Sequence, residues 1–308
     1  MYELYQLGEC SWYIDCPAKI GIYQQSDTEV YLIDGGSDKD AGRKVKKVLD
    51  EKGWKLKGII NTHSNADHIG DNQYLQRQYG CKIFAPGMEA AFINYTLLEP
   101  SLLYGGHPPK ALCHKFLMAA ESECCDISDP DFPAELQIIS LPGHFLQMVG
   151  ILTPDGTAFV ADCVSSAATL DKYKVSFIYD VAEYLKTLDF IETYEAKRFV
   201  PSHADVCESM AELAEINRRC VHEVADKLLE ICAEKLSADR SSRKYGSVQP
   251  EQQHRRNSNR RRDTNCRFSL SPIQRRNDVY HHQNKQSRTG VIVIYKCIAG
   301  NKHPWQPE

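Results

Sequence analysis

Residues 61–68, NTHSNADH, place two histidines and an aspartate within six positions, directly after an apolar run. Imidazole nitrogens and carboxylate oxygens are ligands that suit zinc, iron or manganese. Taken alone, the segment could serve only to cap a following helix, because Asn and Asp are good N-cap residues. Binding of a transition metal therefore requires further ligands from elsewhere in the chain.

Three further ligand-type residues stand where other apolar runs end. His144 closes LPGH, Asp162 lies in FVADC, and His203 closes FVPSH. Because a metal site is closed by ligands from different elements, residues at several strand ends can converge on one centre. Six residues together predict such a centre: His63, Asp67, His68, His144, Asp162 and His203.

The elements that must position these residues begin with strands. Short alternating or apolar runs with turn residues between them predict strands at 2–7, 11–16, 19–24 and 29–34. A helix is expected between a Ser37/Asp38 cap and Gly53. After it we expect a buried strand at 56–61, a helix at about 67–79 and a strand at 81–86.

The second half of the pattern starts after a long connection. Residues 87–134 are predicted to be irregular, and a connection of this length is typical of a lid or a binding loop. Strands are then expected at 135–144, 148–153, 157–164 and 197–203, and helices at about 180–195 and 206–236. The class is mixed α and β, with loops at strand ends available for chemistry.

The composition is that of an ordinary globular protein of 308 residues. The N-terminus has no basic stretch followed by an apolar one, and no segment approaches 18 uninterrupted apolar residues, so we expect a cytoplasmic protein without membrane contact. The 12 cysteines are scattered, which favours reduced thiols over a disulfide framework.

The C-terminal part differs from the rest. Residues 237–288 carry 13 Lys or Arg against 4 Asp or Glu, a balance of +9 in a chain of net charge −4, which leaves about −13 for the remainder. The acidic body argues against nucleic acid as a partner or substrate. We therefore divide the chain into a domain at 1–236 and a basic low-complexity tail at 237–308, which is expected to be disordered or poorly packed. The tail is open to three interpretations: an arm that binds nucleic acid or another partner, a solvated tail, or a slip of the reading frame near codon 237.

The ordered set of motifs resembles a known family, the metallo-β-lactamase-fold superfamily, over about residues 1–235. Its signature is H-x-H-x-D-H after a strand, then a His in a P-G-H turn, an Asp at a strand end and a last His at a strand end. Here the order is His63, Asn65, Asp67 and His68, then His144, Asp162 and His203. The strand ending in LIDGG resembles the early strand of the family, with its Asp at Asp34.

The resemblance implies an α+β fold, a four-layer αββα sandwich, with a dinuclear metal site. It also implies two zinc ions, with iron or manganese as alternatives, and a hydroxide between the ions as the nucleophile. Asp67 and Asp162 would be the catalytic carboxylates. One metal would be held by His63, Asn65 and His144, the second by Asp67, His68 and His203, and Asp162 would bridge them.

The sequence departs from the family at Asn65, where the signature has its second histidine. An amide oxygen is a neutral and weaker donor than imidazole. Three outcomes stay open: a dinuclear centre with a weakened first site, one metal in the second site, or a single iron on His63, His144 and Asp162. The last set has the ligand count of non-haem iron oxygenases, and some persulfide dioxygenases of the superfamily use those positions.

We therefore expect a metal-dependent hydrolase of a small ester, thioester, lactone or related substrate. The alternatives are an iron dioxygenase acting on sulfur substrates and a non-catalytic metal-binding module. Asp34 is expected to orient a ligand, and Cys163 to be a buried thiol on the other face of its strand. The oligomeric state is left open, and candidate substrate contacts are Tyr104, His107, His114, Lys115, Phe145 and Tyr179.

Overall fold

The computed structural model describes the backbone of residues 2–244 and the side chains of residues 2–233. Contacts within the chain separate a unit of residues 1–224, which contains every candidate site residue, from residues 225–308. The elements are β1 (Glu3–Gln6), β2 (Ser11–Asp15), β3 (Ile20–Gln24), β4 (Glu29–Ile33), α1 (Lys39–Lys52), β5 (Lys55–Ile60), α2 (Ala66–Ile69), α3 (Asn72–Tyr79), β6 (Lys82–Ala85), α4 (Gly87–Asn94), α5 (Leu98–Tyr104), the 3₁₀ helix η1 (Lys110–Leu112), β7 (Cys124–Asp126), β8 (Gln137–Ser140), β9 (Val149–Leu152), β10 (Thr157–Ser165), α6 (Ala167–Tyr173), α7 (Val181–Thr193), β11 (Arg198–His203) and α8 (Ala211–Lys244).

Two sheets build the first unit. The larger follows the order β1 to β7 and is antiparallel up to β4 and parallel from β4 onward. The smaller has the order β11-β10-β9-β8, and only its β10–β11 pair is parallel. The parallel pairs β4–β5 and β10–β11 bring the carboxyl ends of both strands to one edge, which is where ligand-type residues follow in the sequence.

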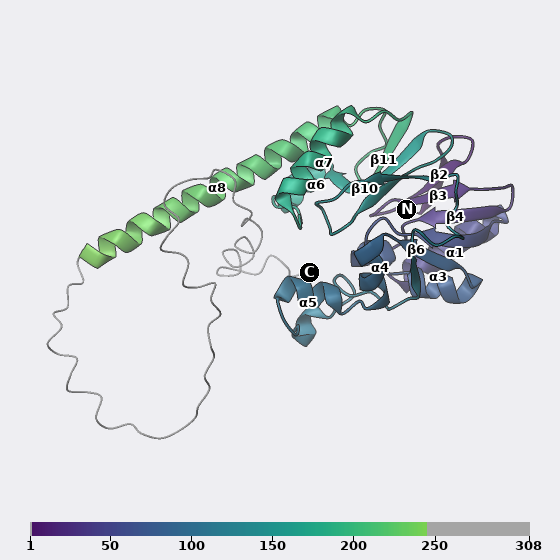
Figure 1. The fold of residues 1–308 in the computed structure, drawn as a ribbon, viewed down its shortest axis with the longest axis horizontal. Helices are drawn as coiled ribbons and strands as arrows, with labels where there is room; N and C mark the ends of the chain where they lie inside the picture. The colour runs from purple at the N-terminus through teal and green to yellow at the C-terminus, as the bar shows by residue number, and fades with distance from the viewer. Residues whose placement is uncertain (1, 245–308) are drawn as a thin grey trace, which may run out of the picture. The chain divides into compact units, whose positions relative to one another are not determined.

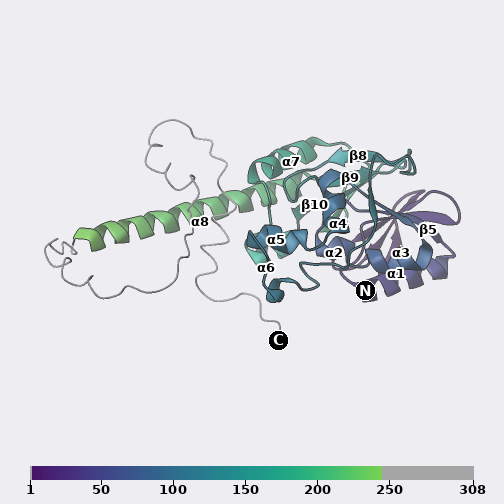
Figure 2. The same ribbon diagram turned by 60° about the horizontal axis from the view of Figure 1, so that its bottom comes forward.

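Both faces of each sheet are buried, and this produces four layers. On β4, Val30 and Leu32 pack in a core with residues of α1, whereas Tyr31 and Ile33 pack in a core shared with β9, β10 and β11. The outer face of the second sheet packs against α7 and the start of α8. Figures 1 and 2 show α1 and α3 beside the first sheet and α7 beside the second. The predicted αββα sandwich is confirmed.

Helix α1 illustrates how local signals set element ends. The Asp38 carboxylate accepts hydrogen bonds from the backbone nitrogens of Asp40 and Ala41, which satisfies two of the free N–H groups at the helix start. Gly53 ends the helix in the left-handed conformation, with φ 71°. The predicted bounds of this helix are therefore correct, as are the positions of the ten strands predicted from periodicity.

Other predicted bounds are wrong. The helix expected at 67–79 is two helices, α2 and α3, interrupted near Gly70, where a Cβ would lie 2.2 Å from the Ser37 backbone. Residues 87–134 are not simply irregular, because they contain α4, α5, η1 and β7. The short helix α6 was not predicted.

The last helix begins later and ends later than predicted. It starts at Ala211 instead of about residue 206, because Cys207 forms a bridge with Phe199 of β11. It continues to Lys244, so residues 237–244 are helical instead of lacking periodicity. The rest of the predicted tail, residues 245–308, lies outside the described residues. Within the described part of the chain, no helix is both long and apolar enough to cross a membrane.

Candidate metal centre

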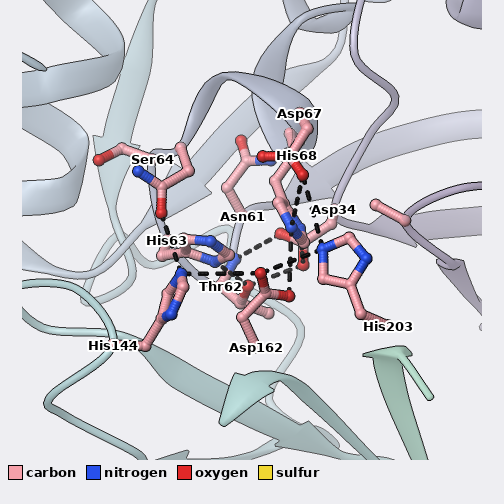
Figure 3. Close-up of polar contacts among 12 residues, drawn as sticks. Asp34, Asn61, Thr62, His63, Ser64, Asp67, His68, His144, Asp162 and His203 are labelled. Carbon is pink, nitrogen blue, oxygen red and sulfur yellow. Dashed lines mark hydrogen bonds and ion pairs between the residues drawn. The ribbon is translucent and has the colours of Figure 1, made fainter. Parts of the chain in front are cut away.

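The six ligand-type residues predicted to converge do lie together. Figure 3 shows side chains from the loop after β5, the turn after β8, strand β10 and the end of β11 pointing toward one another. The ligand atoms form three groups, and within each group they lie no more than 4.8 Å apart. The groups are Asp34, His63 and His68; His63, His144 and Asp162; and Asp67, His68 and His203. We call His63, His144 and Asp162 the first cluster, and Asp67, His68 and His203 the second cluster.

Asp34 fixes the loop that carries most of these residues. It follows β4 with a φ of 63°, a left-handed conformation that Asp tolerates better than most residues. One carboxylate oxygen accepts from the Thr62 backbone nitrogen at 2.7 Å, and the other accepts from the Thr62 hydroxyl at 2.7 Å and from His68 Nδ1 at 3.1 Å. Nδ1 of His68 is therefore engaged, and Nε2 is left to face the clusters.

The same network sets the tautomer of His63. The Thr62 hydroxyl donates its proton to Asp34, so its oxygen accepts from Nδ1 of His63, which lies 3.0 Å away. Neutral His63 then carries its proton on Nδ1 and presents the lone pair of Nε2. The His63 side chain is fully buried, so this lone pair has no access to bulk water.

His144 is placed by a tight turn. Gly143 has φ 116°, and a Cβ there would lie 2.2 Å from the Tyr184 backbone nitrogen, so only glycine fits. The backbone nitrogen of Tyr179 donates to the carbonyl oxygens of Gly143 and His144, which holds the turn from the other side. Nε2 of His144 lies 3.6 Å from an oxygen of Asp162.

Asp162 lies where β10 departs from regular pairing. The register with β11 shifts on both sides of Ala161, which has φ 50°. Such a bulge re-aims the next side chain, and Asp162 thereby reaches the space between the two clusters. Its carboxylate lies 3.3 Å from His68 Nε2 and 3.2 Å from His203 Nε2.

The second cluster is completed from two elements. His203, at the end of β11, donates from Nδ1 to the Pro17 carbonyl oxygen at 3.0 Å, so its Nε2 points to the carboxylates. Asp67, in α2, lies 3.5 Å from His203 Nε2 and 3.8 Å from His68 Nε2. The Asp67 side chain is 46% exposed, so the second cluster has an open side at this residue.

The histidines of the first cluster are held neutral in the metal-free chain. Burial lowers the pKa of His63 well below its ordinary value, and the nearby His68 lowers it further. Burial also lowers the pKa of His144. Both rings are therefore neutral at neutral pH, so neither has to lose its charge to become a metal ligand.

The histidines of the second cluster are held charged. The Asp162 carboxylate is the main cause that raises the pKa of His203 to about 10. For His68, burial opposes the charged form, but the carboxylates around it outweigh burial and raise its pKa well above the ordinary value. In the metal-free chain the two clusters therefore hold their histidines in opposite protonation states.

Three buried polar atoms that face the clusters make no hydrogen bond of good geometry: His63 Nε2, and the pair His68 Nε2 and Asp162 Oδ1, which lie 3.3 Å apart as an ion pair. A buried polar atom without a partner costs about 1–3 kcal/mol, so the lone pair of His63 Nε2, enclosed beside this ion pair, needs an explanation. Imidazole nitrogens and carboxylate oxygens at this spacing fit a divalent transition metal, which would satisfy all three atoms.

Asn65 points toward the first cluster. It occupies the N-cap position of α2, yet its side chain makes no capping hydrogen bond. Its amide oxygen lies 3.2 Å from His144 Nε2, and its amide nitrogen donates to Glu99 Oε1 at 2.8 Å. The simple capping interpretation of the sequence segment is therefore wrong for this side chain.

A family comparison agrees with this geometry. A model of the metallo-beta-lactamase superfamily matches residues 14–203, a range that begins in β2 and ends at His203. The chain belongs to the metallo-beta-lactamase superfamily. The match includes every residue of the two clusters, and the superfamily is one of metallo-hydrolases.

The matches to individual relatives are either of low identity or limited to a short segment. The chain is 24% identical to a beta-lactamase-like protein 2 homolog of Drosophila melanogaster over 196 residues, which is 59% of this chain and 60% of the relative. It is 37% identical to a hydroxyacylglutathione hydrolase of Rhizobium etli over 72 residues, which is 22% of this chain and 28% of the relative. The chain thus spans less than two thirds of the length of these relatives.

The solved structures it resembles share the fold. The subclass B3 metallo-beta-lactamase MEM-A1, isolated from a soil metagenome library, superposes with a TM-score of 0.55 at 16% identity. The superposition covers 74% of this chain and 97% of that enzyme. At this identity the likeness supports the superfamily's fold and says nothing of the substrate.

Two buried glutamates support the loop after β5, which carries His63 and Asn65, and the sequence did not indicate either of them. Glu89 of α4 accepts hydrogen bonds from the backbone nitrogen and hydroxyl of Ser64 and from the backbone nitrogen of Gln147. It therefore ties the loop of His63 to the turn of His144. Burial raises the pKa of Glu89 to about 7 and that of Glu99 to about 8. A usable signal was the presence of Glu within the largely apolar segments that form α4 and α5.

The predicted substrate contacts separate into two groups. Lys115 pairs with Asp38 at 2.9 Å, at the start of α1, and His114 packs against Phe116. Phe145 is fully buried, and its ring packs against Phe92, Phe177 and Tyr179. The structure gives no contact of Tyr104 or His107 with the clusters among its described residues.

The Phe145 group adjoins the site, because the Phe177 ring lies 5.6 Å from that of His144. An aromatic wall therefore borders the first cluster. Cys163, next to Asp162, is fully buried in the core of the second sheet's outer face, as predicted for a thiol on the other side of the strand.

Proposed function

We propose that this chain is a metal-dependent hydrolase that acts on a small ester, thioester, lactone or related substrate. The observation that carries the proposal is the convergence of three buried ligand atoms: His63 Nε2, which has no hydrogen-bond partner, and His68 Nε2 and Asp162 Oδ1, which lie 3.3 Å apart. Membership of a superfamily of metallo-hydrolases, and relatives named as hydrolases, support the same reaction type.

Seven residues would hold the metal. His63 and His144, with the amide oxygen of Asn65, would hold one ion, and Asp67, His68 and His203 the other, with Asp162 between them. When bound, such ions supply Lewis-acid polarisation and activation of water. Zinc fits this mixed set, and iron and manganese fit it as well.

The chain's own side chains have defined tasks in this proposal. Asp34 and the Pro17 carbonyl oxygen hold Nδ1 of His68 and of His203, so that each ring presents Nε2. Asp67 lies at the exposed side of the second cluster with Oδ2 facing His68 and His203, so it would be the carboxylate that holds the metal next to the substrate. The aromatic rings of Phe145, Phe177 and Tyr179 exclude water on the side of His144, and Phe177 and Tyr179, which are not fully buried, can contact an apolar part of the substrate.

A second candidate function is a mononuclear iron oxygenase. The first cluster consists of two histidines and one carboxylate, His63, His144 and Asp162, and this is the ligand set of many non-haem iron oxygenases. Burial keeps both of its histidines neutral, which suits immediate metal binding. In this alternative the second cluster would not be needed for the reaction.

Metal analysis and activity assays of one preparation separate the candidates. The full chain is purified without added metal, its metal content is measured by mass spectrometry, and a panel of esters, thioesters and lactones is assayed beside oxygen uptake with thiol and persulfide substrates. About two zinc or manganese ions with hydrolysis support the proposal, and one iron with oxygen uptake supports the alternative. A chain with no metal affinity and no activity would contradict both.

A further inference from the structure

The amide of Asn65 can lie in either of two orientations, and only one of them is useful for binding a cation. An amide oxygen has lone pairs for a metal ion, whereas an amide NH₂ group has none and would direct its protons at the cluster. Both orientations have nearly the same shape, so packing alone does not choose between them. A hydrogen-bond partner must make the choice.

Glu99 is the hydrogen-bond partner that selects the orientation of the Asn65 amide. It lies in α5, is only 6% exposed, and accepts the hydrogen bond of the Asn65 amide nitrogen at 2.8 Å. Turning the amide would break this hydrogen bond and bring the amide oxygen against Oε1 of Glu99, which, once the carboxyl group is ionised above its pKa of about 8, has no proton to donate in return. With the nitrogen held by Glu99, the amide oxygen faces His144 Nε2 at 3.2 Å.

We propose that Glu99 is a positioning residue for the first cluster, where it fixes the Asn65 amide so that its oxygen joins His63, His144 and Asp162 as a fourth donor. This inference rests on the proposed function, because it assumes that the clusters bind metal. It also assigns a task to α5, which lies in the segment predicted to be irregular. The first position would have two imidazole nitrogens and two oxygen donors, namely the charged carboxylate of Asp162 and the uncharged amide of Asn65.

The first test is a metal titration of the full chain and two variants. Glu99→Gln keeps an oxygen that can accept from Asn65 but adds an NH₂ group that can donate to the turned amide, so affinity at the first position should fall by less than in Glu99→Leu. Glu99→Leu removes the acceptor, and affinity there should fall about 10- to 100-fold, the usual effect of losing a residue that orients a ligand. The first position is identified as the binding step that His144→Ala removes, and the other step should not change.

The second test observes the amide itself and does not depend on whether Glu99→Leu folds. The side-chain amide protons of Asn65, assigned in a ¹⁵N spectrum by their loss in Asn65→Ala, should exchange slowly with solvent. They should remain slow when Zn²⁺ is added, because the nitrogen stays on Glu99 while the oxygen faces the cluster. Rapid exchange in the zinc-loaded chain would overturn the inference.

The outcomes distinguish this inference from the proposed function. A chain that binds neither Zn²⁺ nor Mn²⁺ overturns both. A chain that binds metal, together with a folded Glu99→Leu variant of unchanged affinity at the first position, overturns only the role of Glu99. An equal loss at both binding steps in Glu99→Leu would show a general structural effect and would also overturn it.

Discussion

Metal binding to the second cluster should release about two protons at pH 7, whereas binding to the first should release almost none. His203, with a pKa of about 10, and His68, with a pKa well above the ordinary value, are protonated in the metal-free chain at pH 7. Both must lose that proton to become ligands. His63 and His144, with lowered pKa values, have none to lose.

The magnitude follows from linkage. Each proton that must leave makes apparent affinity rise about tenfold per pH unit, or about 1.4 kcal/mol, as long as the pH is below the pKa of the group. Two protons give about a 100-fold gain per unit for the second cluster between pH 6.5 and 8. The sign is fixed, because raising the pH removes the competing protons and strengthens binding.

Calorimetric titration with Zn²⁺ in buffers of different ionisation enthalpy counts these protons. Asp162→Asn, which removes the main carboxylate that raises the pKa of His203, should lower the count. His107→Gln, a change at an exposed histidine outside the clusters, should leave it unchanged. A count near zero for the original chain would refute the protonation states assigned to His68 and His203.

Three further predictions concern single changes. Asp162→Ala should abolish retention of both metals, since its carboxylate lies between the clusters and offsets the repulsion of two cations; full metal content by mass spectrometry would exclude a bridging role. Asp71→Asn should flatten the pH dependence of stability. Burial raises the pKa of Asp71 to about 7, so the folded chain binds more protons than the unfolded chain between about pH 4 and pH 7. Asp71 therefore lowers stability as the pH rises through that window, by up to about 4 kcal/mol, and urea denaturation at pH 5 and pH 8 should show a smaller difference in the variant. Removal of residues 245–308 should leave metal content unchanged, because every candidate ligand precedes Ala204, and a chain that loses its metal on truncation would contradict this.

The sequence predicted which residues converge because most of them lie where an apolar run ends, whereas Asp162 lies inside β10, at the bulge beside Ala161. Strands such as β5 and β11 are buried on both faces and therefore appear as short apolar runs with a sharp polar end. The residues that follow, His63 and His203 among them, cannot be core residues of the same strand. Parallel pairing then brings them to a common edge, which is why a list of strand-end residues is close to the observed set.

The supporting residues could not be predicted in the same way. Helices α4 and α5 have eight and seven residues, about two turns each, which is too short for a helical period to stand out. Glu89 and Glu99 are also far in sequence from the residues they hold, so no local rule connects them to Ser64 or Asn65. Only the tertiary contacts identify them as part of the site.

Asn65 shows how a distant contact can override a local preference. By residue type and backbone conformation it should cap α2, and its backbone carbonyl oxygen does accept from the His68 nitrogen at 2.9 Å. Its side chain could cap the helix only by giving up Glu99 or His144. A cap contributes about 1 kcal/mol to a helix that here has only four residues, whereas breaking the bond to Glu99 leaves a buried carboxyl group without that partner, at a cost of about 1–3 kcal/mol or more. The balance favours the contact with Glu99, and the amide that would have capped the start of α2 is turned toward the candidate metal ligands instead.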